Sequence, residues 1–133
     1  MNLRDLRTFL ILQLLAIAVA GLSFKFIESR LLAGAVAGFY FVSSGLFMVL
    51  RTWRWRDKWS STMWYPLLIH VFLISIPMVT ARFMQMRLGF EEVRIWSLSG
   101  PVFHRLSSNI FMLLMIATVF DLIRVYRRNR NSA

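Results

Sequence analysis

The chain has 133 residues, of which 58% are hydrophobic and 17% charged, and its mean hydropathy is +0.60. Soluble domains average about 45–50% apolar and about 25% charged residues, so this composition excludes an ordinary soluble fold and predicts a small integral membrane protein. The absence of cysteine excludes disulfides and thiolate metal sites. Lys and Arg outnumber Asp and Glu by 16 to 6, giving a formal net charge of +10.

Four apolar stretches are long enough to cross a bilayer, which requires about 17–25 mostly apolar residues. They cover residues 8–24, 31–50, 63–81 and 106–123. Backbone polar groups in lipid must be hydrogen-bonded within the segment, so each stretch is predicted to be a helix. We therefore expect an all-α integral membrane protein: a single domain, 1–133, with four transmembrane helices in two antiparallel hairpins. As an alternative, Ala18-Val19-Ala20 resembles a signal-peptide cleavage site, and cleavage there would leave three spans.

The distribution of basic residues predicts the orientation, because cytoplasmic loops of membrane proteins carry an excess of Lys and Arg. The predicted end that carries both termini holds ten of the 16 basic residues, and the other end holds six. Both termini, and the basic tail 124–133, are thus expected in the cytoplasm, in a bacterial inner membrane. The basic residues assigned to topology and lipid headgroups on this side are Arg51, Arg54, Arg56, Lys58, Arg127, Arg128 and Arg130.

The loops carry two patterns of apolar and aromatic residues. Four of the five tryptophans, Trp53, Trp55, Trp59 and Trp64, lie beside the basic run and are predicted to form an interfacial belt. In the longest connection, 82–101, the spacing of three apolar side chains predicts either a short interfacial helix or an irregular loop.

Small residues in the first two spans predict close helix packing. Gly34 and Gly38 are four residues apart on one helix face, and Gly45 extends that face one heptad later. Ala16 and Ala20 offer a matching face on the first span. This pattern favours packing within the first hairpin, with docking onto a partner subunit or a second copy as the alternative.

Polar or helix-breaking residues inside the spans are candidates for a transport path or a ligand site. Pro77 is expected to kink the third span by freeing the carbonyl of Leu73. The candidates are Gln13, His70, Pro77, Ser108 and Thr118. The alternative is a structural role for each.

Asp121 lies near the end of the fourth span. We expect it to pair with Arg124, three residues later, at the cytoplasmic interface.

The motifs of several enzyme classes are missing from the sequence. It contains no glycine-rich phosphate loop and no H-E-x-x-H metal motif, and its carboxylates are spread along the chain. We therefore predict a non-enzymatic protein without a cofactor or a metal site. Because the arginine clusters adjoin membrane spans, the bilayer is predicted as their partner rather than nucleic acid.

Two short segments resemble known families. The region from Gln13 through Gly34 and Gly38 to Met48 resembles the first hairpin of ATP synthase protein I, a small four-helix assembly factor, although the charged pair expected in its third helix is missing. The Gly34-x-x-x-Gly38 motif with Ile76-Pro77 resembles the holin-like murein-hydrolase exporters, although Ala33 stands where their proline precedes the first glycine.

Three functional hypotheses remain at this point. The first is a non-catalytic accessory or assembly subunit of a larger inner-membrane complex, which contacts other membrane subunits. The second is a small homo-oligomeric transporter or channel, holin-like or solute-conducting, built by self-association. The third is a haem- or pigment-binding membrane subunit that uses His70 as its ligand.

Overall fold

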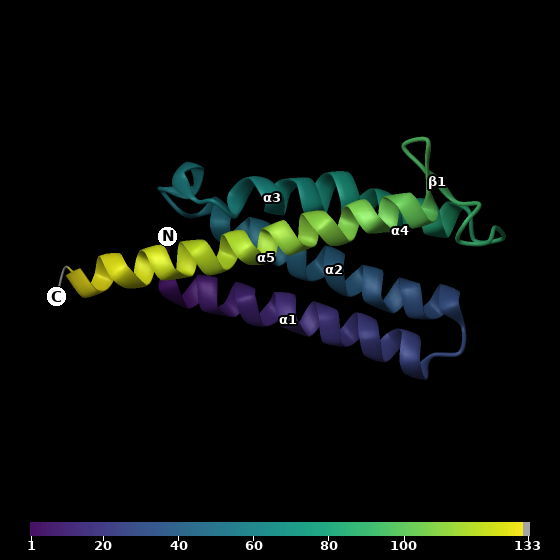
Figure 1. Cartoon of the computed structure of the whole chain (residues 1–133), viewed down its shortest axis with the longest axis horizontal. Helices are drawn as coiled ribbons and strands as arrows, with labels where there is room; N and C mark the ends of the chain where they lie inside the picture. The colour runs from purple at the N-terminus through teal and green to yellow at the C-terminus, as the bar shows by residue number, and fades with distance from the viewer. Residues whose placement is uncertain (132–133) are drawn as a thin grey trace.

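The computed structural model describes residues 1–131 and consists mainly of long helices lying side by side (Figure 1). They are α1 (Leu3–Phe26), α2 (Arg30–Trp53), a third helical segment over Trp64–Met84, and α5 (Gly100–Asn131). Within the described residues, these four helices are long and apolar enough to cross a membrane, which confirms that part of the fold prediction. Residues 132–133 of the predicted tail lie outside the described part.

Helices α1 and α2 begin before their predicted apolar stretches, at polar residues that cap them. The side chain of Asn2 accepts a hydrogen bond from the amide of Arg4 (3.0 Å) at the start of α1. Ser29 does the same for the amide of Leu32 (3.3 Å) at the start of α2. Such caps satisfy amides that have no partner inside the helix, so the helices continue past the apolar residues that hydropathy detects.

The third segment changes its helical geometry before Pro77. It comprises α3 (Trp64–Leu68), a π-helical stretch η2 (Ile69–Ser75) and α4 (Ile76–Met84). The amide of Ile76 donates to the carbonyl of Val71, five residues earlier, as in a π-helix. Proline cannot donate a hydrogen bond and crowds the preceding turn of an α-helix. The wider π-helical turns lie where the sequence predicted a disturbance by Pro77.

The helices enclose a narrow core and expose broad apolar faces. Helix α1 packs against α2 and α5, and the third segment packs against α2 and α5. Leu6, Phe9, Trp64 and Leu114 have no exposed surface at the centre of the main cluster. By contrast, Phe39 on the outside of α2 is 74% exposed. This pattern, with apolar residues outside as well as inside, is typical of helices surrounded by lipid.

The connection after α4 forms a small hairpin, so of the two alternatives predicted there the interfacial helix is not found in the described residues. Strands β1 (Arg94–Ile95) and β2 (Leu98–Ser99) pair antiparallel. Trp96 and Ser97 between them both have positive φ, at 52° and 66°. Two such residues are typical of the tight turn that matches the twist of paired strands.

The four tryptophans of the predicted belt divide into two exposed and two buried side chains. Trp53 and Trp59 are 60% and 62% exposed. Trp55 and Trp64 are instead buried, with 7% and 0% exposure, and belong to the main core. The 3₁₀ turn η1 (Lys58–Ser60) carries Trp59 against Trp64 in an edge-to-face contact.

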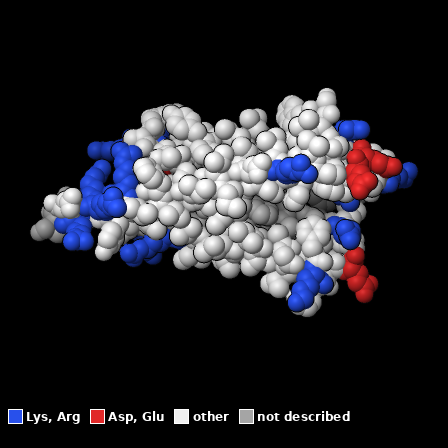
Figure 2. Space-filling view, viewed as in Figure 1, with Lys and Arg blue, Asp and Glu red and all other residues white. Residues whose placement is uncertain are grey.

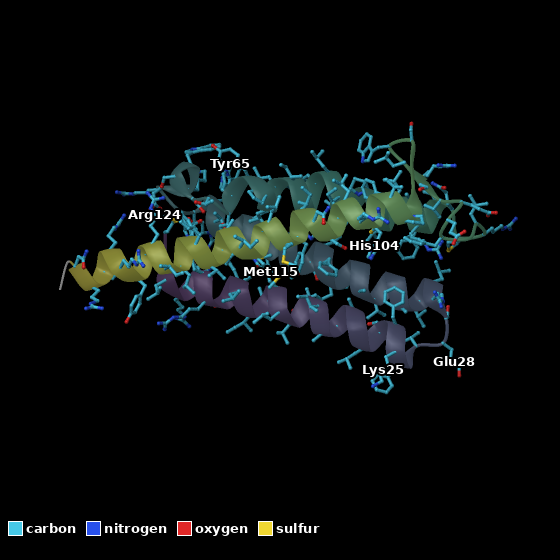
Figure 3. All side chains as sticks on the ribbon, viewed as in Figure 1. Lys25, Glu28, Tyr65, His104, Met115 and Arg124 are labelled. Atoms are coloured by element: carbon cyan, nitrogen blue, oxygen red, sulfur yellow. The ribbon has the colours of Figure 1, made fainter. Side chains whose placement is uncertain are left out.

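The two ends of the bundle differ in charge. Both termini lie at the same end (Figure 1), and Lys and Arg gather there, whereas the other end carries Lys and Arg together with acidic groups (Figure 2). Lys25 and Glu28 mark this second end at the connection between α1 and α2 (Figure 3). We call the end with the termini the basic end.

Candidate functional site

The most strongly hydrogen-bonded polar group inside the bundle is the carboxylate of Asp121 on α5, which has no exposed surface. Its Oδ2 accepts from the hydroxyl of Ser61 (2.7 Å) and the amide of Met63 (3.0 Å), and its Oδ1 accepts from the amide of Thr62 (3.1 Å). These donors immediately precede α3, where backbone amides lack helical partners. Asp121 therefore fixes the beginning of the third segment to α5.

This arrangement replaces the predicted pairing of Asp121 with Arg124. The guanidinium of Arg124 donates to the carbonyl of Ser60 (3.0 Å). Figure 3 shows Arg124 at the basic end, close to the start of α3. The carboxylate of Asp121 and the guanidinium of Arg124 thus both bind the segment that leads into α3, and they do not bind each other.

A second polar contact joins α1 to α5. The amide nitrogen Nε2 of Gln13 donates to Oγ1 of Thr118 (2.8 Å), and the Thr118 hydroxyl donates to the carbonyl of Leu114 (2.8 Å). Gln13 is 1% exposed and Thr118 is not exposed, and the sulfur of Met48 lies 3.9 Å from Nε2. The contact satisfies the donors of Gln13 across the helix interface, while its Oε1 has no partner in the described residues.

His70 occupies the π-helical stretch and is 2% exposed. Its Nε2 lies 3.2 Å from the hydroxyl of Ser75, and its Nδ1 has no hydrogen-bond partner in residues 1–131. The rings of Phe41 and Phe111 pack beside it, with centroid distances of 5.8 and 5.2 Å. π-Helical segments often occur at functional sites, and among the candidates in residues 1–131 this histidine offers an unpartnered ring nitrogen inside such a segment.

The basic end contains a further polar cluster that sequence reasoning missed. Asp5 is 6% exposed; its Oδ1 accepts from the guanidinium of Arg51 (2.6 Å) and its Oδ2 from the indole of Trp55 (3.0 Å). The carboxylate of Asp57 binds the N-terminal ammonium group of Met1. This hydrogen bond from the ammonium group lowers the pKa of Asp57 below its usual value. No spacing rule connects these residues, which come from the N-terminus, α1, the end of α2 and the loop after it.

The small residues pack differently from the prediction. A Cβ atom at Gly45 would lie 2.6 Å from Cγ2 of Val71, and a Cβ atom at Gly38 would lie 2.6 Å from Cγ2 of Val79. These two glycines therefore admit the third segment, not α1. At Gly34 the nearest other atom is in Phe24, at 3.9 Å.

The remaining small or polar candidates are divided between interior and surface. Ala16 is 1% exposed, within the contact of α1 with its neighbours, and Ala20 is half-buried. Ser108 is exposed, and its hydroxyl donates to the carbonyl of His104 on its own helix (3.1 Å). His104 lies toward the other end of α5 from Arg124 (Figure 3). Of the five predicted path residues, the structure brings together only Gln13 and Thr118 by a direct bond.

In residues 1–131, no group of three or more His, Asp or Glu side chains is placed to hold a metal ion. Comparison with protein-family models, curated proteins and solved structures finds no match. Neither of the two family resemblances is therefore supported by a matching family model.

Proposed function

We propose that the protein is a non-catalytic accessory or assembly subunit of a larger complex in a bacterial inner membrane. The observation that carries this proposal is that two buried polar side chains of the spans, Gln13 and Asp121, are bonded within the chain. Gln13 binds Thr118, and Asp121 binds the start of α3. Two of the five predicted path residues, Gln13 and Thr118, thus hold α1 and α5 together.

The outer faces of the helices support contact with other membrane proteins. They carry large apolar side chains such as Phe39 and Leu50, which is 67% exposed. Gly34 adds a place where another helix can approach closely, because little of this chain lies against it. We place both termini in the cytoplasm, since the basic end holds ten of the 16 basic residues.

The test is purification from native membranes in mild detergent through a C-terminal tag, followed by identification and quantification of what copurifies. The expected result is one membrane complex at fixed stoichiometry, whose assembled amount falls when the chain is deleted and returns when it is re-expressed. Gly34→Ile is expected to reduce copurification. Gly21→Ile is the matched control, because an added Cβ would meet no atom within 4 Å at Gly21 and none closer than 3.9 Å at Gly34.

A defined homo-oligomer that conducts a solute in liposomes, without a copurifying complex, would refute the accessory role and support a small transporter. Tags that report the two termini in different compartments would refute the orientation.

The free Nδ1 of His70 favours haem or pigment binding as a second candidate function. An absorption band above the aromatic region, present in the native protein and lost in His70→Phe, would support it. A spectrum without such a band in protein purified from native membranes would reject it.

A further inference from the structure

A groove at the basic end lies between the beginning of α1 and the end of α5. Its volume is about 310 Å³, and it is lined by Leu3, Arg7, Leu122, Ile123, Tyr126, Arg127 and Arg130. Helices α1 and α5 pack against each other, and both run to this end of the bundle (Figure 1). The groove therefore combines residues that are more than a hundred positions apart in the sequence.

The charge of the groove is entirely positive. Arg7, Arg127 and Arg130 are exposed, and in residues 1–131 the structure gives their guanidinium groups no hydrogen-bond or carboxylate partner. The three acidic residues of the basic end are already bound: Asp5 to Arg51, Asp57 to the N-terminal ammonium group, and Asp121 to the segment that leads into α3. An anion that enters the groove thus meets three guanidinium groups that have no competing carboxylate.

The other side chains of the groove are apolar or amphipathic. Leu3, Leu122 and Ile123 supply aliphatic surface, with Ile123 46% exposed. Tyr126 is 54% exposed and belongs to a residue type that prefers the boundary between lipid and water. A ligand that fits this lining has an anionic group for the arginines and a hydrocarbon chain for the aliphatic residues.

We infer that this groove binds a phospholipid with an anionic headgroup, whose phosphate contacts Arg7, Arg127 and Arg130 and whose acyl chain lies along Leu122 and Ile123. Arginine binds phosphate through paired hydrogen bonds, and basic pockets between membrane helices are suited to such headgroups. The inference goes beyond a general attraction of basic residues to the membrane, because it names a site formed jointly by α1 and α5. It requires the bilayer but no partner subunit.

The experiment is native mass spectrometry of the detergent-solubilised protein titrated with defined lipids. We expect one molecule of cardiolipin, a phospholipid with two phosphates, to bind more tightly than phosphatidylglycerol, and both to bind at least ten-fold more tightly than phosphatidylcholine. Arg127→Gln/Arg130→Gln is expected to weaken cardiolipin binding roughly thirty-fold, since each nearby charge contributes about a factor of five. Arg7→Gln alone is expected to weaken it about five-fold.

The matched control is Arg54→Gln/Arg56→Gln, which removes two charges at the same end but outside the groove; binding is expected to change less than two-fold. An equal loss in this control would overturn the site and leave only diffuse attraction. Equal binding of phosphatidylcholine would also overturn it. Glycerophosphoglycerol, which lacks acyl chains, is expected not to compete; effective competition would identify a soluble phosphate ester as the ligand and refute the lipid. Copurification of a partner complex is a separate measurement, so this inference and the proposed function fail independently.

Discussion

Replacing Asp121 by alanine is expected to destabilise the bundle more than any other single removal of a polar group. Three donors converge on its carboxylate, and two of them, in Ser61 and Met63, belong to residues that are 1% and 0% exposed. A buried donor left without a partner costs about 1–3 kcal/mol. Thr62 is exposed, so its amide can bind water instead. The two buried donors together predict a loss of about 2–6 kcal/mol for Asp121→Ala.

Asp121→Asn keeps one acceptor oxygen and places an amide N–H against the remaining donors. It is expected to cost about 1–3 kcal/mol, less than alanine. The double variant Asp121→Ala/Ser61→Ala should lose less than the sum of the single variants, because both remove the same hydrogen bond. Glu91→Ala, in an exposed loop position, is the control and should change stability by less than about 0.5 kcal/mol.

The assay is unfolding by titration of a denaturing detergent into protein held in a mild one, followed by tryptophan fluorescence. Trp64 directly follows the capped segment and reports its loss, and amide exchange at Thr62 and Met63 should accelerate in Asp121→Ala. Stability of Asp121→Ala within about 0.5 kcal/mol of the native chain, with unchanged exchange at these two amides, would refute the capping role.

Three further outcomes are expected from the same unfolding assay. Gly45→Ala should lower the free energy of unfolding by about 1–3 kcal/mol, because its methyl group would overlap a valine of the third segment. Gly34→Ala should be neutral or slightly stabilising. Equal effects of the two variants would contradict the assigned packing. Gln13→Leu should cost about 0.6–1.7 kcal/mol through loss of its bond to Thr118, and no loss would show that this bond contributes nothing. Asp57 has a lowered pKa, so its stabilising effect is present above its unfolded pKa of about 3.9 and disappears as the pH falls through the lower folded value. The stability difference between the native chain and Asp57→Asn should therefore be constant from about pH 7 to pH 5 and shrink below about pH 4; a difference that grows on acidification would contradict this.

The number of the apolar helices and their approximate positions could be predicted from the sequence, because burial in lipid requires long runs of apolar residues and such runs are visible without any tertiary information. The capped extensions of α1 and α2 were missed because Asn2 and Ser29 lie outside the apolar runs. Asn and Ser before a helix are a recognised capping signal, so a search for caps beyond each apolar segment would have found them.

The partners of the buried groups could not be predicted, because they depend on which helix faces meet. Asp121 binds residues 58 to 60 positions away, while the sequence suggested the local partner Arg124. The faces of Gly38 and Gly45 were recognised as close-packing, but the sequence does not state which helix approaches them. Composition alone likewise could not separate the buried tryptophans, Trp55 and Trp64, from their exposed neighbours.

The distribution of polar contacts separates the tasks of the interior and the surface. Asp5, Gln13 and Asp121 bind groups from other helices or loops, so changes at these positions should act on the stability of the fold. In residues 1–131, the groove arginines have no hydrogen-bond or carboxylate partner, and Gly34 has few neighbours. Changes there should leave unfolding nearly unaffected and alter only what the protein binds. If surface variants alter binding while unfolding is unchanged, the function lies on the outer surface, as an accessory subunit requires. If only destabilising variants lose binding, the function lies in the interior.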